Sequence, residues 1–184
     1  MNHSSHSNFY PAALQCVTSH YDDRPDPEDV SLLVIHNISL PPEQFGGKDI
    51  EAFFCGKLDK SRHPYFELIA DMRVSAHCLI KRNGEVVQFV PFNHRAWHAG
   101  KSSFQGRSIC NDYSIGIELE GADHIAYTNA QYASLLKLSH YIMALFPHIT
   151  LARIVGHCDI APLRKSDPGV AFDWPLFRQG LSAL

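Results

Sequence analysis

Short apolar runs that end at turn residues predict buried strands in this chain. The run Leu32–Ile35 is continuously apolar, as in a strand that is covered on both faces, and His36 follows it directly. Residues 152–157, ARIVGH, form a second short run, which ends at His157. We therefore expect two histidines at the ends of buried strands.

Residues 114–120, SIGIELE, alternate between apolar and polar or small side chains. Successive side chains of a strand point to opposite faces, so the apolar members share one face. That face holds Ile115, Ile117 and Leu119, and the opposite face holds Ser114, Gly116, Glu118 and Glu120. The pattern predicts a half-buried strand that presents Glu118 on its polar face.

Residues 75–90 contain two β-prone runs that flank Asn83 and Gly84. This residue pair accepts positive φ angles, which predicts a hairpin with a tight type I′ turn. Residues 93–107, which carry glycine and serine, are expected to form a loop.

The clearest predicted helix covers residues 128–147. Thr128 and Gln131 have the spacing of a capping box, apolar residues then recur at helical spacing, and Pro147 ends the pattern. Shorter helices are expected over residues 48–54 and after Asp173. Together these elements predict one α/β or α+β domain, in which a central mixed β-sheet is flanked by helices.

Composition narrows the possible partners. The chain has 184 residues, a net charge of -3 and no basic stripe, so we expect a single domain that does not bind nucleic acid. No apolar run has the length of a membrane span, and the first residues do not resemble a secretory signal, so we expect no membrane association and a cytoplasmic location. The five cysteines contain no CxxC pair, which favours free thiols. We expect a monomer with a loosely ordered segment over residues 1–20 and the folded domain over residues 21–184.

The loop of residues 156–169, GHCDIAPLRKSDPG, is dense in charged and metal-binding residue types. Two histidines and one carboxylate are the protein ligands of many catalytic zinc sites, and they leave a fourth position for water. His36, His157 and either Asp159 or Asp167 can supply such a set. The spacing alone leaves open which aspartate would bind, and it also leaves open a solvated loop without metal.

Five blocks of the chain resemble the AmpD-type N-acetylmuramoyl-L-alanine amidases. The resemblance runs from about Tyr21 to about Phe177, and the blocks are LLVIHNISLPP, RVSAHCLIKRNGEVVQFVPF, RAWHAGKSSFQGR, CNDYSIGIELEG and VGHCDIAPLRKSDPGVAFDW. These amidases are cytoplasmic zinc enzymes of bacterial peptidoglycan recycling. The resemblance therefore implies a fold like that of peptidoglycan recognition proteins and a zinc amidase domain over residues 21–184.

The same resemblance implies the metal ligands and the catalytic residues. One zinc ion per chain would bind His36, His157 and Asp167, whereas many members of the wider family use a cysteine as the third ligand. Glu118 matches the catalytic glutamate, in agreement with its place on the polar strand face, where Glu120 is the rival. Lys165 matches the lysine that stabilises the oxyanion.

The implied substrate is a muropeptide, cleaved between the lactyl group of (1,6-anhydro-)N-acetylmuramic acid and L-alanine. Matching positions imply that five residues bind it, although each could equally have a structural role: Asn37, Arg73, His77, Trp97 and His98. By resemblance, the activity would serve peptidoglycan recycling and indirectly control β-lactamase induction. A non-catalytic recognition module and an exported wall amidase are the alternatives, and the complete set of ligand and catalytic residues favours the enzyme.

Overall fold

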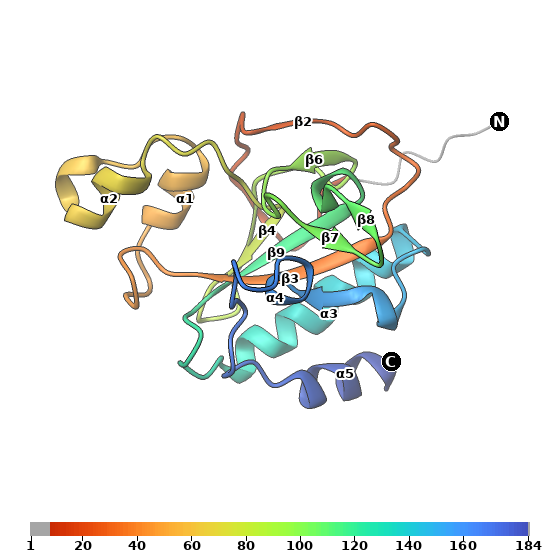
Figure 1. Ribbon diagram of the computed structural model, residues 1–184. Coiled ribbons are helices and arrows are strands. Elements are labelled where there is room, and N and C mark those ends of the chain that lie inside the picture. The colour runs from red at the N-terminus through yellow and green to blue at the C-terminus, as the bar shows by residue number, and fades with distance from the viewer. Residues whose placement is uncertain (1–7, 184) are drawn as a thin grey trace.

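The structure is a computed structural model that describes residues 8–183, and a six-stranded sheet forms its centre (Figure 1). The strand order is β1-β5-β4-β9-β3-β10, and only the β4–β5 pair is antiparallel. The strands are β1 (Leu14–Gln15), β5 (Val86–Gln88), β4 (Cys78–Ile80), β9 (Ser114–Glu120), β3 (Leu32–Ile38) and β10 (Ile154–Gly156). The predicted mixed sheet is confirmed.

The strand β9 is buried on both faces, whereas the alternating pattern predicted a half-buried strand. It lies between β4 and β3, and every one of its seven residues is buried. The prediction failed because the polar face of β9 is covered by protein rather than by water. His36 of β3 is the register partner of Glu118, so these two side chains come from adjacent central strands.

The predicted hairpin forms, but its turn is not the predicted type I′. Strands β4 and β5 pair antiparallel. Of the two turn residues, only Gly84 has a positive φ, at 85°. The Asn83 side chain instead accepts a hydrogen bond from the backbone N–H of Glu85 at 2.9 Å. The connection is therefore longer than a two-residue turn, and it requires a left-handed backbone conformation at Gly84 alone.

Two helices cover one side of the sheet (Figure 1). They are α3 (Asn129–Leu145), which begins with the predicted capping box of Thr128 and Gln131, and α5 (Trp174–Ser182), which Asp173 caps. Their apolar side chains share a core with the side chains of β3 and β9 on that face. The helices α1 (Asp49–Phe54) and α2 (Pro64–Ile69) lie at one end of the sheet and pack around a second core.

Short elements complete the fold, and the sequence pattern did not predict most of them. Part of the segment over residues 93–107, which was expected to be a loop, forms strands. The sequence pattern missed these strands because they are too short to show alternation. The remaining elements are β2 (Tyr21–Asp23), paired with β6 (His94–Ala96), β7 (Ser103–Phe104), paired with β8 (Arg107–Ser108), α4 (His157–Ile160), and the 3-10 helices η1 (Lys60–Arg62), η2 (Cys110–Asp112) and η3 (Leu151–Arg153). Within the described residues, no helix is both long and apolar enough to cross a membrane.

Residues 8–20 pack against the sheet, which corrects the expectation of a loosely ordered segment for this part of the chain. The strand β1 extends the sheet beside β5, and the side chain of Gln88 accepts a hydrogen bond from the backbone N–H of Tyr10 at 2.7 Å. Thr18 and His20 are buried. Backbone pairing holds this segment, and composition does not reveal such pairing. Residues 1–7 lie outside the described part of the chain.

Candidate metal centre

Three side chains from distant parts of the chain meet at the carboxyl ends of β3 and β10. His36 belongs to β3, His157 begins α4 directly after β10, and Asp167 lies in the loop after α4. The Nδ1 atoms of the two histidines are 2.9 Å apart, and the Asp167 Oδ2 atom is 3.1 Å from that of His36 and 3.0 Å from that of His157. Parallel neighbouring strands bring their ends to one edge, which explains the convergence.

The protonation of these groups favours a bound cation. The outer nitrogen of His157, Nε2, lies 3.1 Å from the carbonyl oxygen of Ala99, which can only accept a hydrogen bond. Nε2 of His157 therefore carries a proton, and Nδ1 is the nitrogen that can bind a metal. Burial lowers the pKa of His36 to about 4, so its imidazole is neutral near pH 7.

Asp167 supplies a negative charge at this point. Burial alone would raise its pKa, but the imidazoles of His157 and His36 against the carboxylate hold that pKa well below its usual range. The carboxylate oxygen and the two imidazole nitrogens thus converge on one point, where a cation would take the place of the imidazole protons. This donor set suits zinc, and the spacing allows one ion to contact all three atoms. Among residues 8–183, these three side chains form the group of histidine, cysteine and acidic residues close enough to share an ion.

The alternative ligands from the same loop have other roles. The Oδ2 atom of Asp159 accepts a hydrogen bond from the backbone N–H of Gly156 at 2.7 Å, so this carboxylate caps the start of α4. Cys158 is half-buried, and its backbone N–H donates to the carbonyl of Asp167 at 3.0 Å. Neither side chain belongs to the convergent group.

Glu118 and Glu120 share a strand face but have different surroundings. Both carboxylate oxygens of Glu120 accept backbone hydrogen bonds, one from Gly46 at 2.6 Å and one from Arg82 at 2.9 Å. The buried Oε2 atom of Glu118 has no hydrogen-bond partner among the described residues. Burial, followed by the nearby charge of Asp167, raises the pKa of Glu118 well above its ordinary value. Glu118 is therefore the carboxylate available for proton transfer.

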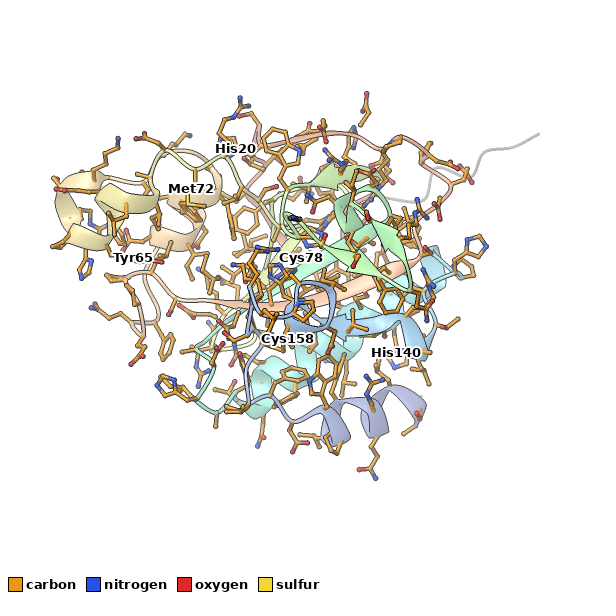
Figure 2. All side chains as sticks on the ribbon, in the orientation of Figure 1. His20, Tyr65, Met72, Cys78, His140 and Cys158 are labelled. Carbon is orange, nitrogen blue, oxygen red and sulfur yellow. The ribbon has the colours of Figure 1, made fainter. Side chains whose placement is uncertain are left out.

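A pocket of about 360 Å³ opens over the three convergent side chains, and Glu118 and Lys165 also line it. Its far wall is apolar and comes from α1, α2 and the segment after α2: Phe53, Phe54, Tyr65, Ile69 and Met72. Figure 2 shows Tyr65 and Met72 on the α2 side, away from Cys158. The neighbour of Lys165, Arg164, does not line the pocket. Its guanidinium donates hydrogen bonds to the carbonyls of Ala99 and Lys101 at 2.7 and 2.8 Å. One side of the pocket is thus polar and carries the convergent side chains, and the other side is apolar.

The structure brings three of the five expected substrate-binding residues to this pocket, namely Asn37, Trp97 and His98. The amide nitrogen of Asn37 donates to Asp123 at 2.8 Å and to the carbonyl of Pro168 at 3.1 Å. Arg73 and His77 do not line the pocket. Arg73 lies over the ring of Trp97 at 5.3 Å, and His77 is fully buried, where its Nδ1 atom accepts the backbone N–H of Gly116.

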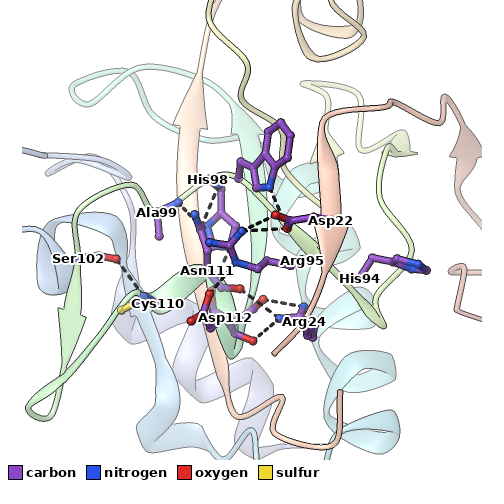
Figure 3. A network of polar contacts seen from close by, with 12 residues as sticks. Asp22, Arg24, His94, Arg95, His98, Ala99, Ser102, Cys110, Asn111 and Asp112 are labelled. Atoms are coloured by element: carbon purple, nitrogen blue, oxygen red, sulfur yellow. Dashed lines mark hydrogen bonds and ion pairs between the residues drawn. The ribbon is translucent and has the colours of Figure 1, made fainter. Parts of the chain in front are cut away.

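A polar network fixes Trp97, and its members had not been predicted. The indole N–H of Trp97 donates to Asp22 at 3.0 Å, and Arg95 binds the same carboxylate through two contacts of 2.8 and 2.9 Å. Arg95 also donates to Asp112 at 2.6 Å. Figure 3 shows Asp22, Arg95 and Asp112 together. Asp22 and Arg95 are partners in the β2–β6 pair, and nothing in the sequence indicated that pairing.

Comparisons with known proteins agree with this geometry. The sequence model of the family described as N-acetylmuramoyl-L-alanine amidase matches residues 26–170. The chain is 62% identical over 160 residues to the 1,6-anhydro-N-acetylmuramyl-L-alanine amidase AmpD of Haemophilus influenzae, with 87% of each protein covered. It is 60% identical over 166 residues to AmpD of Escherichia coli, with 90% of each covered.

Solved structures give the same result. A crystal structure of a selenomethionine derivative of AmpD matches with a TM-score of 0.93 and 55% identity, covering 96% of this chain and 98% of that one. The amidase AmiD of Escherichia coli matches with a TM-score of 0.59 and 28% identity, covering 94% of this chain and 60% of that one. Since the family model spans most of the sequence, the chain belongs to the N-acetylmuramoyl-L-alanine amidase family and is an amide-hydrolysing enzyme.

Proposed function

We propose that this chain is a zinc-dependent amidase that cleaves muropeptides between the lactyl group of (1,6-anhydro-)N-acetylmuramic acid and L-alanine. The observation that carries the proposal is the convergence of His36, His157 and Asp167 beside Glu118, whose buried oxygen is unpaired. One zinc ion per chain would bind the three convergent atoms. When bound, zinc supplies Lewis-acid polarisation and makes water more acidic.

The other two residues would handle the proton and the developing charge. Glu118 accepts the proton of the attacking water and passes it to the leaving amine of L-alanine, a role that its raised pKa suits. Lys165 lines the same pocket, and its ammonium group stabilises the negative charge that develops on the carbonyl oxygen. An ammonium group has no lone pair, so Lys165 would not bind the metal.

The substrate class is supported by the names and ligands of the relatives. The AmpD proteins are named as 1,6-anhydro-N-acetylmuramyl-L-alanine amidases, and the AmiD structure is a complex with anhydro-N-acetylmuramic acid-L-Ala-D-γ-Glu-L-Lys. In this chain, Trp97 offers a flat apolar face to the sugar or the peptide stem. Arg73, whose guanidinium lies over the ring of Trp97, would pair with a carboxylate of the peptide stem. Asn37 would support the site by holding the loop at Pro168. His77, which does not line the pocket, would hold the backbone of Gly116 in β9.

Mass spectrometry of the products tests the proposal. Purified protein is incubated with anhydro-muropeptide and with reduced muropeptide, each with and without a zinc chelator. We expect free peptide and free sugar from the anhydro substrate, and no cleavage after chelation. Binding of muropeptide without cleavage in the presence of zinc would instead support a recognition module.

The cellular setting is also a proposal. We propose that the chain acts as a monomer in the cytoplasm on muropeptides already released from the wall, where it would serve peptidoglycan recycling and indirectly control β-lactamase induction. Fractionation of the native host and a comparison of intact sacculi with soluble anhydro-muropeptides test this setting. Recovery outside the cytoplasm, or faster cleavage of sacculi, would contradict it.

A further inference from the structure

His98 lines the pocket, but its ring nitrogens are engaged inside the protein. Its Nδ1 atom lies 2.9 Å from the outer nitrogen of His36, Nε2, and its own Nε2 atom lies 3.1 Å from the hydroxyl of Ser114. The backbone N–H groups of His98 and Ala99 both donate to the side chain of Asn111, at 3.1 and 2.8 Å. The position of His98 is thus fixed from both sides.

Proton positions follow from these contacts. For Nδ1 of His36 to offer a lone pair to a metal, the single proton of the neutral ring must lie on Nε2. That N–H then donates to Nδ1 of His98, which leaves the proton of His98 on Nε2, where it donates to Ser114. The opposite tautomer of His98 would donate to His36 and force its proton onto Nδ1, where a metal ligand cannot carry one.

The fold provides space for this ring. A Cβ atom at Gly116 would lie 2.5 Å from the Cγ and Nδ1 atoms of His98, a distance that real structures essentially never show. Because Gly116 has no positive φ, backbone conformation does not explain why a glycine occupies this position, whereas the close approach of His98 does. The glycine of the β9 polar face therefore makes room for the imidazole behind His36.

We infer that His98 is a positioning residue for the metal ligand His36 and not a substrate-binding residue. Accepting the N–H of His36 fixes the tautomer and the orientation of that ligand, and Ser114 and Gly116 fix His98 in turn. The inference rests on the proposed zinc site. Outer partners of metal-binding histidines typically contribute about 10–100-fold to metal affinity, and we expect that scale here.

Zinc affinity of the metal-free protein tests the inference, measured by competition with a chromophoric chelator. His98→Phe keeps the ring and removes the acceptor, and we expect zinc binding weaker by about 10–100-fold. His98→Asn can place an oxygen near the former Nδ1 position, and we expect an affinity closer to that of the parent. Gly116→Ala should weaken zinc binding although Gly116 contacts neither metal nor substrate. Trp97→Phe, which alters the pocket wall, should change KM and leave zinc affinity unchanged.

Circular dichroism and thermal unfolding of each metal-free variant establish that it is folded. If His98→Phe does not fold, Ser114→Ala carries the same test, with an expected smaller loss of zinc affinity. Parent-like zinc affinity in the folded variants, with a raised KM for His98→Phe, would overturn the inference and make His98 a substrate-binding residue. Failure of the parent protein itself to bind zinc would instead refute the proposed metal site.

Discussion

At the scale of single residues, the environment of each carboxylate determines what it can do. Glu118 and Glu120 are two positions apart on one strand, yet backbone N–H groups occupy both oxygens of Glu120 and leave Glu118 with an unpaired oxygen. A buried carboxylate that accepts backbone hydrogen bonds stabilises local structure. A desolvated carboxylate beside a pocket is suited to proton transfer.

Glu118→Gln is expected to lower kcat by about 10²–10⁴-fold, because it keeps the shape and removes proton acceptance. Zinc content should stay near that of the parent. Glu120→Gln places an amide N–H against a backbone donor, so we expect a loss of about 1–3 kcal/mol in the free energy of unfolding, with kcat close to that of the parent. Steady-state kinetics and urea denaturation of both variants provide the check, and equal kcat for Glu118→Gln and the parent would refute the assignment.

Lys165→Met keeps the length of the side chain and removes its charge. We expect kcat to fall by about 10²–10³-fold, the usual scale for the loss of one oxyanion-stabilising group. KM should change less, because the contact forms mainly in the transition state. Lys101→Met is a suitable control, since the side chain of Lys101 is exposed, whereas Arg164 holds two backbone carbonyls. A change in KM alone, or loss of zinc, would make Lys165 a binding or structural residue.

At the scale of elements, helices and strands whose signals lie within one short segment of sequence were predicted well. The helix α3 carries its capping box and apolar stripe within one segment, and β3 and β10 are short apolar runs with clear ends. Elements held by distant partners were missed. β1 forms only because β5 lies beside it, and β2 only because β6 does.

The same distinction applies to the site. The candidate ligand set and Glu118 were named from the resemblance, and the apolar runs indicated that His36 and His157 lie near the carboxyl ends of buried strands. The spacing left Asp159 and Asp167 equivalent, because the cap that occupies Asp159 is a feature of the folded backbone. The separation of Arg73 and His77 from the pocket depends on tertiary packing, which the sequence pattern does not contain.

The capping box of α3 gives a prediction at this scale. The hydroxyl of Thr128 accepts the N–H of Gln131 at 3.1 Å and donates to the carbonyl of Arg82 at 2.7 Å. Thr128→Ala should therefore lower the free energy of unfolding by about 1 kcal/mol. Thr150 precedes η3 without a side-chain cap, so Thr150→Ala is the matched control and should have a much smaller effect. Equal losses in urea denaturation of the two variants would contradict the role of the cap.

At the scale of the whole molecule, the fold keeps several imidazoles neutral in its interior. Burial lowers the pKa of His77 and of His98 well below the ordinary value of 6.5, and the pKa of His36 to about 4. The unfolded chain binds protons at these histidines below about pH 6.5, whereas the folded chain does not. The stability that they contribute is therefore present above pH 6.5 and is lost as the pH falls.

The free energy of unfolding of the metal-free protein should thus fall between pH 6.5 and pH 5. Each buried histidine adds up to about 1.4 kcal/mol per pH unit to the slope. His77→Gln should reduce that slope, with the exposed His148→Gln as the control. Urea denaturation at a series of pH values measures it, and the absence of any pH dependence in this range would show that the histidines are not buried in their neutral form.

In the proposed centre, one metal ion is held by His36 together with His157 and Asp167, which lie 121 and 131 residues further along the sequence. The most direct test is zinc titration of metal-free protein while cleavage of soluble anhydro-muropeptide is measured. We expect activity to rise to a plateau at one zinc per chain, Asp159→Ala to behave like the parent, and Asp167→Ala to lose zinc binding and activity together. Full activity of the metal-free parent, or loss of zinc by Asp159→Ala but not by Asp167→Ala, would contradict the proposed centre.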